Sequence, residues 1–181
     1  MYAMKVAIIG FSGAGKSTLA KRLSELYGGE VLYLDKVFWL PNWVERPREE
    51  TRQIIGEFLD THDGWVIDGS YGAFHQERRM SEADEIVILM FNRFSCLYRA
   101  IKRRIQYHKK PRESMTEGCE ERISFEFLMW LIWKGRTKRR LDKFKEIQAK
   151  YSEKTVVLKT QKQLDDYLAS RLALSEQEIS K

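Results

Sequence analysis

A lysine and a serine at the end of a glycine-rich stretch are the residues of this chain best suited to phosphate chemistry. Between Gly10 and Ser17 the chain reads glycine, four residues, and then Gly15-Lys16-Ser17. Glycines let a loop adopt positive φ angles and bring its backbone N–H groups close to phosphate oxygens. In such a loop Lys16 reaches the β- and γ-phosphates and Ser17 ligates Mg²⁺. The spacing is that of a P-loop, and it predicts a nucleotide site built from these residues: Gly10, Ser12, Gly13, Ala14, Gly15, Lys16, Ser17 and Thr18.

The residues on either side of this loop support the prediction. The apolar run Val6 to Ile9 is typical of a buried strand, and Leu19, Leu23 and Leu26 fall on one face of a helix. The N-terminus of that helix would add its dipole to the attraction for phosphate. A glycine-rich turn entering a helix is the alternative, but such a turn does not require the lysine and the serine together.

Hydrophobic periodicity along the rest of the chain predicts five strands that alternate with helices. The expected strands are Lys5 to Ile9, Val31 to Leu34, Trp65 to Ile67, Glu85 to Phe91 and Thr155 to Leu158. The expected helices are Lys16 to Tyr27, Arg48 to Thr61, Ser95 to His108, Glu121 to Tyr151 with a candidate break at Gly135, and Gln161 to Leu172. This alternation predicts an α/β protein with a three-layer P-loop NTPase fold and a five-stranded parallel sheet.

Four segments are expected to lack regular structure. They are the aromatic loop from Phe38 to Trp43, the polar stretch before the fourth strand, the loop from Lys109 to Gly118, and a fraying tail from Ser175.

Two aspartates stand where predicted strands end. Ligands of parallel α/β sheets bind beyond the carboxyl ends of the strands, so both residues are expected at the active edge. Asp68 would hold Mg²⁺ or its water opposite Ser17, with a simple Asp-Gly turn as the alternative. Asp35 would orient or deprotonate an acceptor hydroxyl, with a helix or turn cap as the alternative.

Arginines after the fourth strand could neutralise charge on a phosphoryl group in transfer. Arg99 and Arg103 are four residues apart and share a helix face, so we expect them to act in catalysis with Lys16 and Asp35. A solvated helix face is the alternative for each arginine taken singly. The further candidates for this lid are Arg112, Arg136, Arg139 and Arg140.

The aromatic and imidazole side chains give weaker signals. Trp39 and Trp43 could stack on a flat acceptor, or they could form a small satellite core. The three histidines show no triad or metal-ligand spacing and are expected at the surface.

Composition limits the class of protein. The 181 residues include 43% hydrophobic and 32% charged side chains, as in a globular protein, and they predict one domain spanning residues 1–181. Two cysteines without a CxxC motif favour the reducing cytoplasm, and no apolar run is long enough to span a membrane. The net charge is +6, but residues 93–145 hold 16 Lys/Arg and 6 Asp/Glu, a local balance of +10. The basic character therefore belongs to one segment.

Several classes of P-loop protein can be separated by their motifs. The chain contains neither an Asn-Lys-x-Asp nor an Asp-x-x-Gly tetrapeptide, which a GTPase would need. Motor ATPases of the ABC and AAA types are normally larger. The chain is therefore predicted to be an ATP-dependent kinase that binds ATP and Mg²⁺, with an acceptor-side insert at about residues 36–64 and a basic lid region at about 95–145.

A set of residues along most of the chain resembles one family. They are Leu34-Asp35, Trp39, Pro41-Asn42-Trp43, Trp65 to Tyr71, Arg78, Cys96 to Arg99, Lys102 to Arg104, and Gly118-Cys119 through Glu121-Arg122 to Phe127 and Trp130. This pattern resembles the FlaR-related "DNA topology modulation" proteins, which are similar to adenylate kinase. The resemblance implies a nucleoside-monophosphate-kinase type of P-loop fold with a short helical lid that lacks zinc ligands. It also aligns Asp68-Gly69 and the Arg99/Arg103 pair with adenylate kinase motifs.

The chain also departs from those motifs. Ser70-Tyr71-Gly72 replaces Phe-Pro-Arg, so the arginine that holds the monophosphate in adenylate kinases is missing and Arg78 is the candidate substitute. The expected activity is transfer of the γ-phosphoryl group of ATP to a nucleotide or another small hydroxyl or phosphate acceptor. The alternative is a nucleic-acid-associated or regulatory ATP-binding protein, because a basic segment could follow a nucleic-acid backbone.

Overall fold

The computed structural model describes residues 4–106, 113–119 and 125–179. Its central element is a parallel sheet in the order β2-β5-β1-β6-β7. The strands are β1 (Lys5–Gly10), β2 (Glu30–Tyr33), β5 (Trp65–Asp68), β6 (Glu85–Leu89) and β7 (Thr155–Leu158). The predicted five-stranded parallel sheet is confirmed, and the third of these strands, β5, lies beside the P-loop strand β1 as expected.

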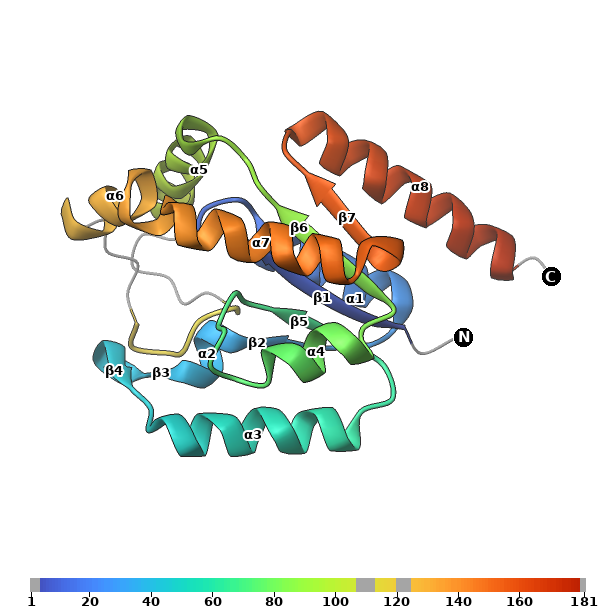
Figure 1. The fold of residues 1–181 in the computed structure, drawn as a ribbon, viewed down its shortest axis with the longest axis horizontal. Helices are drawn as coiled ribbons and strands as arrows, with labels where there is room; N and C mark the ends of the chain where they lie inside the picture. Colours follow the sequence, from blue (N-terminus) through green and yellow to red (C-terminus); the bar gives the residue numbers. More distant parts are fainter. Residues whose placement is uncertain (1–3, 107–112, 120–124, 180–181) are drawn as a thin grey trace.

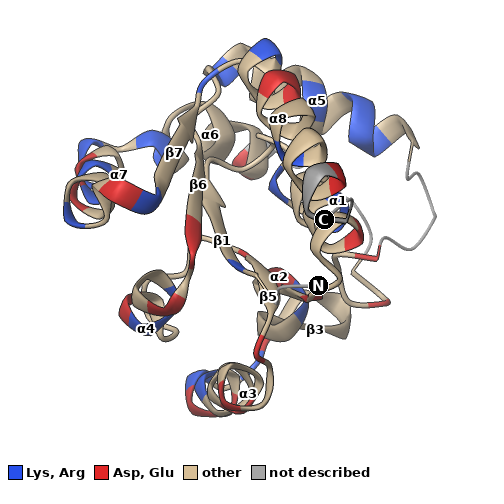
Figure 2. Ribbon diagram, turned by 90° about the vertical axis from the view of Figure 1, so that its right-hand side faces the viewer, with Lys and Arg blue, Asp and Glu red and all other residues tan. Residues whose placement is uncertain are grey.

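Helices cover both faces of the sheet, which makes the three-layer α/β architecture (Figures 1 and 2). Figure 2 shows α1 (Lys16–Tyr27) and α8 (Gln161–Ile179) on one side, and α3 (Arg48–Thr61), α4 (Gln76–Glu82) and α7 (Lys138–Lys150) on the other. The helices α5 (Arg93–Gln106) and α6 (Phe125–Ile132) lie toward the carboxyl ends of the strands (Figure 1).

The central strands are apolar because both of their faces are covered by helices. Every residue from Val6 to Gly10 and from Glu85 to Leu89 is buried. Leu19 and Leu23 of α1 pack into the same core as Ile55 of α3. Helix α1 ends where Gly28 takes a positive φ of 71° and donates its N–H to the Ser24 carbonyl, as the sequence predicts.

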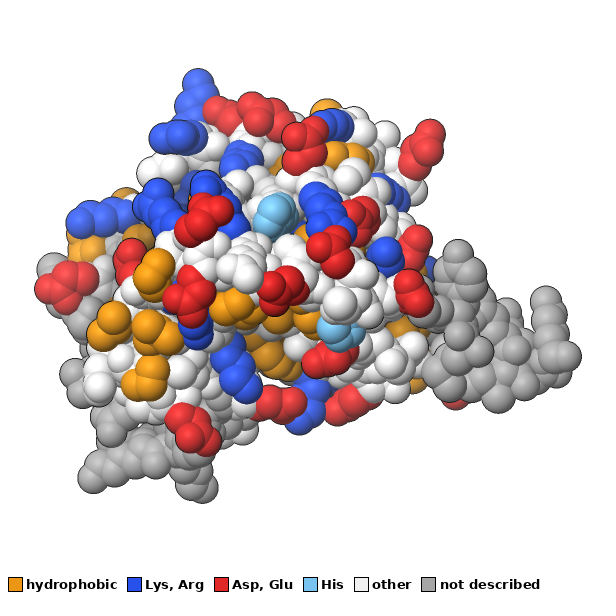
Figure 3. Space-filling model, turned by 90° about the horizontal axis from the view of Figure 1, so that it is seen from below, with side chains coloured by type: hydrophobic (Ala, Val, Ile, Leu, Met, Phe, Trp, Pro, Cys, Tyr) orange, Lys and Arg blue, Asp and Glu red, His pale blue; other side chains and the backbone are white. Residues whose placement is uncertain are grey.

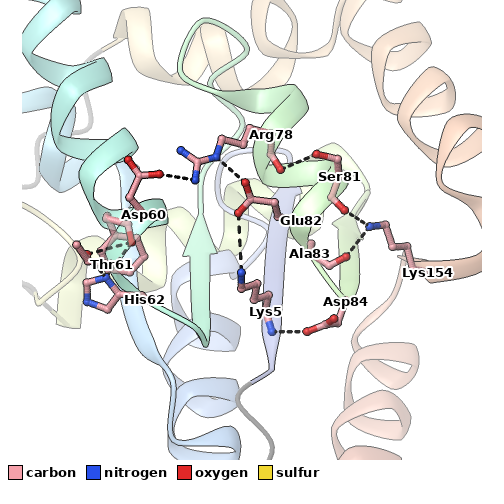
Figure 4. A network of polar contacts seen from close by, with 11 residues as sticks. Lys5, Asp60, Thr61, His62, Arg78, Ser81, Glu82, Ala83, Asp84 and Lys154 are labelled. Atoms are coloured by element: carbon pink, nitrogen blue, oxygen red, sulfur yellow. Dashed lines mark hydrogen bonds and ion pairs between the residues drawn. The ribbon is translucent and has the colours of Figure 1, made fainter.

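Polar contacts join the amino end of the sheet to the helices (Figure 4). Arg78 binds Asp60 at the end of α3, at 2.7 Å, and also Glu82 of α4. Lys5 of β1 lies 3.9 Å from Glu82, and its backbone N–H donates to Asp84 at 2.8 Å. These contacts lie at the edge of the sheet opposite the P-loop.

Several local expectations were wrong. The segment expected as an aromatic loop contains α2 (Leu34–Phe38), β3 (Trp39–Leu40), a 3₁₀ turn η1 (Pro41–Trp43) and β4 (Val44–Glu45). The two short strands pair as an antiparallel hairpin. Contacts remote in sequence fix it, since Thr116 donates to the carbonyls of Lys36 and Trp39, and the Asn42 N–H donates to Gly118.

Other element boundaries also differ from the sequence prediction. The polar stretch before β6 contains the helix α4, and the strand β6 ends at Leu89 instead of Phe91. Helix α8 continues to Ile179, whereas it was expected to end at Leu172 and the tail to fray from Ser175. The break at Gly135 is confirmed, because the 3₁₀ turn η2 (Lys134–Arg136) separates α6 from α7; a second turn, η3 (Ser152–Lys154), precedes β7. Within the described residues, no helix is both long and apolar enough to cross a membrane.

Candidate functional site

A cleft of about 420 Å³ opens at the carboxyl edge of the sheet, between the P-loop and α5. Its walls include most of the residues singled out by the sequence: Ser12, Gly13, Gly15, Lys16, Ser17, Thr18, Asp35, Arg99 and Arg103. Gly10 and Ala14 lie behind this wall, and Ala14 is fully buried. The structure therefore brings the nucleotide-binding and catalytic candidates to one place.

The P-loop is closely packed against its neighbours, which explains its glycines. Gly10 has a φ of +140°, and a Cβ there would lie 2.3 Å from the Leu89 carbonyl oxygen of β6. Gly13 has a φ of +73°, and a Cβ there would lie 2.6 Å from the Cys96 carbonyl oxygen of α5. No side chain caps the N-terminus of α1, so its first N–H groups suit an anion.

Ser17 and Asp68, the two residues that the sequence predicts as metal ligands, are hydrogen-bonded to each other. The Ser17 hydroxyl donates to Asp68 Oδ2 at 2.6 Å, and Asp68 is only 6% exposed. The pairing of β5 with β1 places Asp68 opposite Ile8, two residues before the P-loop begins.

This donor set fits Mg²⁺, which takes one or two protein oxygens together with waters and substrate phosphates. The described part of the chain has no group of three or more His, Cys, Asp or Glu residues able to form a full metal cage. A nucleotide would therefore have to complete the coordination.

Asp35 lies on α2 and lines the cleft from the side of the acceptor insert. Its carboxylate oxygen Oδ1 accepts a hydrogen bond of 2.6 Å from the Tyr71 hydroxyl. Burial, and then the neighbouring Asp35 charge, raise the pKa of Tyr71 well above its ordinary value. The phenol therefore keeps its proton and acts as a hydrogen-bond donor to the carboxylate. The sequence pattern alone offered no signal for this pair.

Two arginines of α5 face the cleft. Arg99 donates to the Ala14 carbonyl at 3.3 Å, and its guanidinium carbon lies 4.4 Å from the centroid of the Phe91 ring. Partial burial lowers the pKa of Arg99, although the side chain remains a cation. Lys102 and Gln106 also line the cleft from this helix, and the sequence analysis did not single them out as site residues. The signals for Lys102 were its place in a basic run and in the pattern that resembles the FlaR-related proteins.

The other described lid candidates do not line the cleft. Arg136 donates to the carbonyls of Phe91 and Leu131, and to the Cys96 sulfur at 3.0 Å. Its guanidinium lies 4.0 Å from the Phe11 ring, behind the P-loop, so it supports the loop from within the protein. Arg139 is exposed on α7 and Arg140 packs on the Trp130 ring, whereas Arg112 lies outside the described residues.

The proposed substitute for the adenylate kinase arginine points elsewhere. Arg78 is held by Asp60 and Glu82 at the opposite edge of the sheet (Figure 4). Its neighbour Arg79 is fully buried and donates to the carbonyls of Phe74 (3.0 Å), Gly69 (3.2 Å) and Tyr71 (2.6 Å). Burial lowers the pKa of Arg79 to about 10. Arg79 thus shapes the loop after β5 that carries Tyr71.

The tryptophans pack as a satellite core. Trp39 meets Phe38 and Trp43 edge to face, with ring centroids 4.9 and 5.6 Å apart, and neither tryptophan lines the cleft. Figure 3 shows apolar side chains gathered at one end of the face around α3, and Trp43 and Val44 of the hairpin are 36% and 54% exposed. This arrangement gives no support for stacking on a base inside the cleft.

The histidines are not simple surface residues. His62 is half-buried and stacks on Phe58 with ring centroids 4.1 Å apart, and His75 contacts the Arg52 carbonyl. His108 lies outside the described residues.

A second cavity of about 580 Å³ lies beside the first and shares Tyr33 and Glu113 with it. It runs along the free edge of β2 and is lined by α2 and by Ile54 of α3. The two cavities together extend from the P-loop to the insert.

Comparison with known proteins supports the fold. No family model matches the chain. A search of curated proteins likewise returned no match. Among solved structures, a shikimate kinase from Bacteroides thetaiotaomicron is similar with a TM-score of 0.50 and 17% identity, over 96% of this chain and 98% of that chain.

A deoxyadenosine kinase from M. mycoides, solved with dCMP and dCDP, has a TM-score of 0.47 and 15% identity, over 98% of both chains. At 17% identity the similarity to the shikimate kinase concerns the fold alone, and together with the parallel sheet order it supports a P-loop fold of the nucleoside-monophosphate-kinase type. Activity has to be argued from the chemistry of the cleft.

Proposed function

We propose that this protein is a P-loop phosphotransferase that moves the γ-phosphoryl group of ATP·Mg²⁺ to a small acceptor, a nucleotide or another hydroxyl or phosphate compound. One observation carries the proposal: a single cleft is lined by Lys16 and Ser17 of the P-loop, by Asp35, and by Arg99 and Arg103. Phosphoryl transfer requires alignment of donor and acceptor and neutralisation of charge, and these residues supply the groups for both.

Each residue has a separate role in this proposal. The P-loop N–H groups and Lys16 hold the β- and γ-phosphates, and Arg99 and Arg103 neutralise charge on the group in transfer. Ser17 and Asp68 would hold Mg²⁺, which when bound supplies positive charge to the phosphate oxygens. Asp35 receives or orients the acceptor.

Two further points agree with this proposal. The resemblance to FlaR-related proteins covers the P-loop, Asp68 and the α5 arginines, and it implies the same donor chemistry. The shikimate kinase that shares the fold is itself a kinase by name. We also propose that residues 1–181 act as one domain, since one cluster of buried apolar residues extends from β1 to α8.

The donor site can be tested by calorimetry of ATP·Mg²⁺ binding. We expect the Lys16→Ala variant to lose binding, since Lys16 is the cation of the P-loop that contacts the phosphates. Lys145→Ala, on the exposed face of α7, is the matched control and should bind as the parent protein does. Unchanged binding by Lys16→Ala would contradict the donor site.

A regulatory ATP-binding protein with negligible transfer activity is the competing function. An acceptor panel of nucleotides, nucleosides and small hydroxyl metabolites separates the two, with ADP formation as the readout. A kinase predicts ADP formation that rises with particular acceptors. A flat response across the panel would favour the regulator.

A further inference from the structure

The surroundings of Asp35 indicate which chemical group of the acceptor molecule receives the phosphoryl group. Asp35 is a carboxylate of α2 that lines the cleft on the insert side, and the Tyr71 hydroxyl donates to one of its two oxygens at 2.6 Å. The second oxygen is then the atom that can accept a proton from a bound molecule. A carboxylate in this state suits an O–H donor.

Tyr71 is held in place relative to both the P-loop and Asp35. The buried Arg79 donates to the Tyr71 carbonyl at 2.6 Å, and the ring packs on Phe38 and Phe74 with centroids 5.3 and 5.6 Å away. The adjacent Ser70 bridges to the P-loop, accepting from the Gly10 N–H at 2.9 Å and donating to the Gly10 carbonyl at 3.0 Å. The Tyr71 hydroxyl is therefore held in one orientation toward the Asp35 carboxylate.

Two arginines of the insert, Arg46 and Arg52, and Arg78 of α4 are held by carboxylates and backbone carbonyls. Arg46 binds Glu50 and the Val37 carbonyl, Arg52 binds Glu49 and the Ala73 carbonyl, and Arg78 binds Asp60 and Glu82. None of these three lines the P-loop cleft that holds Asp35, although Arg46 lines the second cavity. A phosphate placed against Asp35 would meet a like charge at close range, which is unfavourable.

We propose that the group phosphorylated on the acceptor molecule is a hydroxyl, not a phosphate. Asp35 takes the proton of this hydroxyl, and Tyr71 is the positioning residue that orients the Asp35 carboxylate. This inference rests on the proposed phosphotransferase function. In the reaction the acceptor O–H bond breaks and its proton passes to Asp35, while a new bond forms between the acceptor oxygen and the γ-phosphorus. The bond from the γ-phosphorus to the bridging oxygen of ATP breaks, its electron pair leaves with ADP, and Asp35 returns its proton to water.

The first test identifies the bond that forms. The full chain is incubated with ATP, Mg²⁺ and two acceptor panels, one of alcohols (nucleosides, polyols and sugars) and one of nucleoside monophosphates, and products are followed by ³¹P NMR. We expect phosphomonoester resonances from at least one alcohol, and no phosphoanhydride doublets beyond those of ATP and of the ADP that the reaction releases. Transfer only to monophosphates would overturn the hydroxyl assignment but leave the phosphotransferase intact. Transfer to neither panel, with Lys16-dependent ATP binding retained, would reject both.

The second test removes only the hydroxyl of Tyr71, by the substitution Tyr71→Phe, and measures the effect on kcat. Tyr167 gives a matched control, because it is also a buried tyrosine that donates to a carboxylate, Glu85, at 2.9 Å, but it lies on α8 away from the cleft. With the best alcohol acceptor, we expect Tyr71→Phe to lower kcat on the order of tenfold, by analogy with the loss of activity when a residue that orients a metal ligand is replaced. The KM for ATP should stay unchanged, and Tyr167→Phe should keep the parent kcat.

A change in kcat must be distinguished from a loss of folded protein. Circular dichroism and the urea midpoint of both variants show whether each is folded under assay conditions. Equal kcat for folded Tyr71→Phe and Tyr167→Phe would overturn the positioning role. A loss of ATP affinity in Tyr71→Phe without a loss of kcat would do the same, since it would assign Tyr71 to the donor side.

Discussion

Ser17 and Asp68 come from segments 51 residues apart, and a hydrogen bond of 2.6 Å joins their oxygens. Both atoms are hard oxygen donors, and they lie where a nucleotide held by the P-loop would present its phosphates. For these two single residues, we therefore predict a direct effect on the affinity for Mg²⁺.

We expect Asp68→Asn to raise the Mg²⁺ concentration needed for half-maximal nucleotide binding by roughly 10- to 100-fold, because an amide oxygen replaces a charged ligand. The measurement is a Mg²⁺ titration of ATP binding in the parent and the variant. Asp60→Asn, at the opposite edge of the sheet, is the control and should leave the titration unchanged. An unaltered Mg²⁺ dependence in Asp68→Asn would exclude Asp68 as a ligand.

At the scale of elements, the loop after β5 connects the metal side of the site to the acceptor side. It begins at Asp68, contacts the P-loop through Ser70, and presents Tyr71 to Asp35. Arg79 of α4 holds this loop through three backbone carbonyls, while its neighbour Arg78 takes part in a surface ion-pair network. Adjacent residues of one short helix therefore have opposite environments.

This contrast predicts different effects for the same substitution. Arg79→Met keeps much of the volume but leaves buried carbonyls without donors, so we expect a loss of about 3 kcal/mol in the free energy of unfolding. Arg78→Met removes exposed ion pairs and should cost less than about 1 kcal/mol. Urea unfolding of both variants gives the comparison. Equal losses would show that the hydrogen bonds of Arg79 are not what stabilises the loop.

At the scale of the whole molecule, two tyrosines couple stability to pH. Burial and then the nearby Glu85 charge raise the pKa of Tyr167, and burial and Asp35 raise that of Tyr71. An unfolded tyrosine ionises near pH 10, whereas the folded protein retains the proton. Above about pH 10 the unfolded state therefore binds fewer protons, and stability falls as pH rises.

We expect each of these tyrosines to add a slope of up to about 1.4 kcal/mol per pH unit above pH 10. Urea unfolding at pH 8, 9.5 and 11 measures the slope, and the difference between the parent protein and Tyr167→Phe isolates one residue. Tyr98→Phe, at an exposed position of α5, serves as the control for the substitution itself. Parallel pH curves for the parent and Tyr167→Phe would refute this linkage.

The distribution of charge over the whole molecule bears on nucleic-acid binding. The basic segment has a balance of +10 in the sequence, but its helices α5 and α7 lie on opposite sides of the sheet (Figure 2). Arg99, Lys102 and Arg103 line the phosphate cleft. The described cations therefore do not combine into one stripe along a duplex.

We accordingly expect weak duplex DNA binding with a shallow salt dependence. Fluorescence anisotropy between 50 and about 200 mM salt measures the slope of log K against log salt, which falls by about 0.9 for each phosphate contact. A slope corresponding to six or more contacts would support the nucleic-acid alternative.

Features that depend on local pattern could be predicted from the amino-acid sequence. The P-loop spacing, the boundaries Lys16–Tyr27 and Arg48–Thr61, and the apolar strands could all be read directly, because backbone preferences and hydrophobic periodicity act over neighbouring residues. The parallel order of the sheet, with the strand of Asp68 beside the P-loop strand, followed from the crossover rules for alternating strands and helices.

The sequence could not distinguish among residues of the same type, because their surroundings depend on how distant segments pack together. Six arginines looked alike in the basic segment, yet Arg99 and Arg103 face the cleft while Arg136 packs behind the P-loop, because helix orientation is set by packing across the sheet. Packing also separates Arg78 from Arg79. Arg78, the predicted site residue, binds Asp60 and Glu82 away from the cleft, whereas its neighbour Arg79 holds the loop that carries Tyr71. The Tyr71–Asp35 hydrogen bond joins residues 36 positions apart, and no local pattern encodes such a contact.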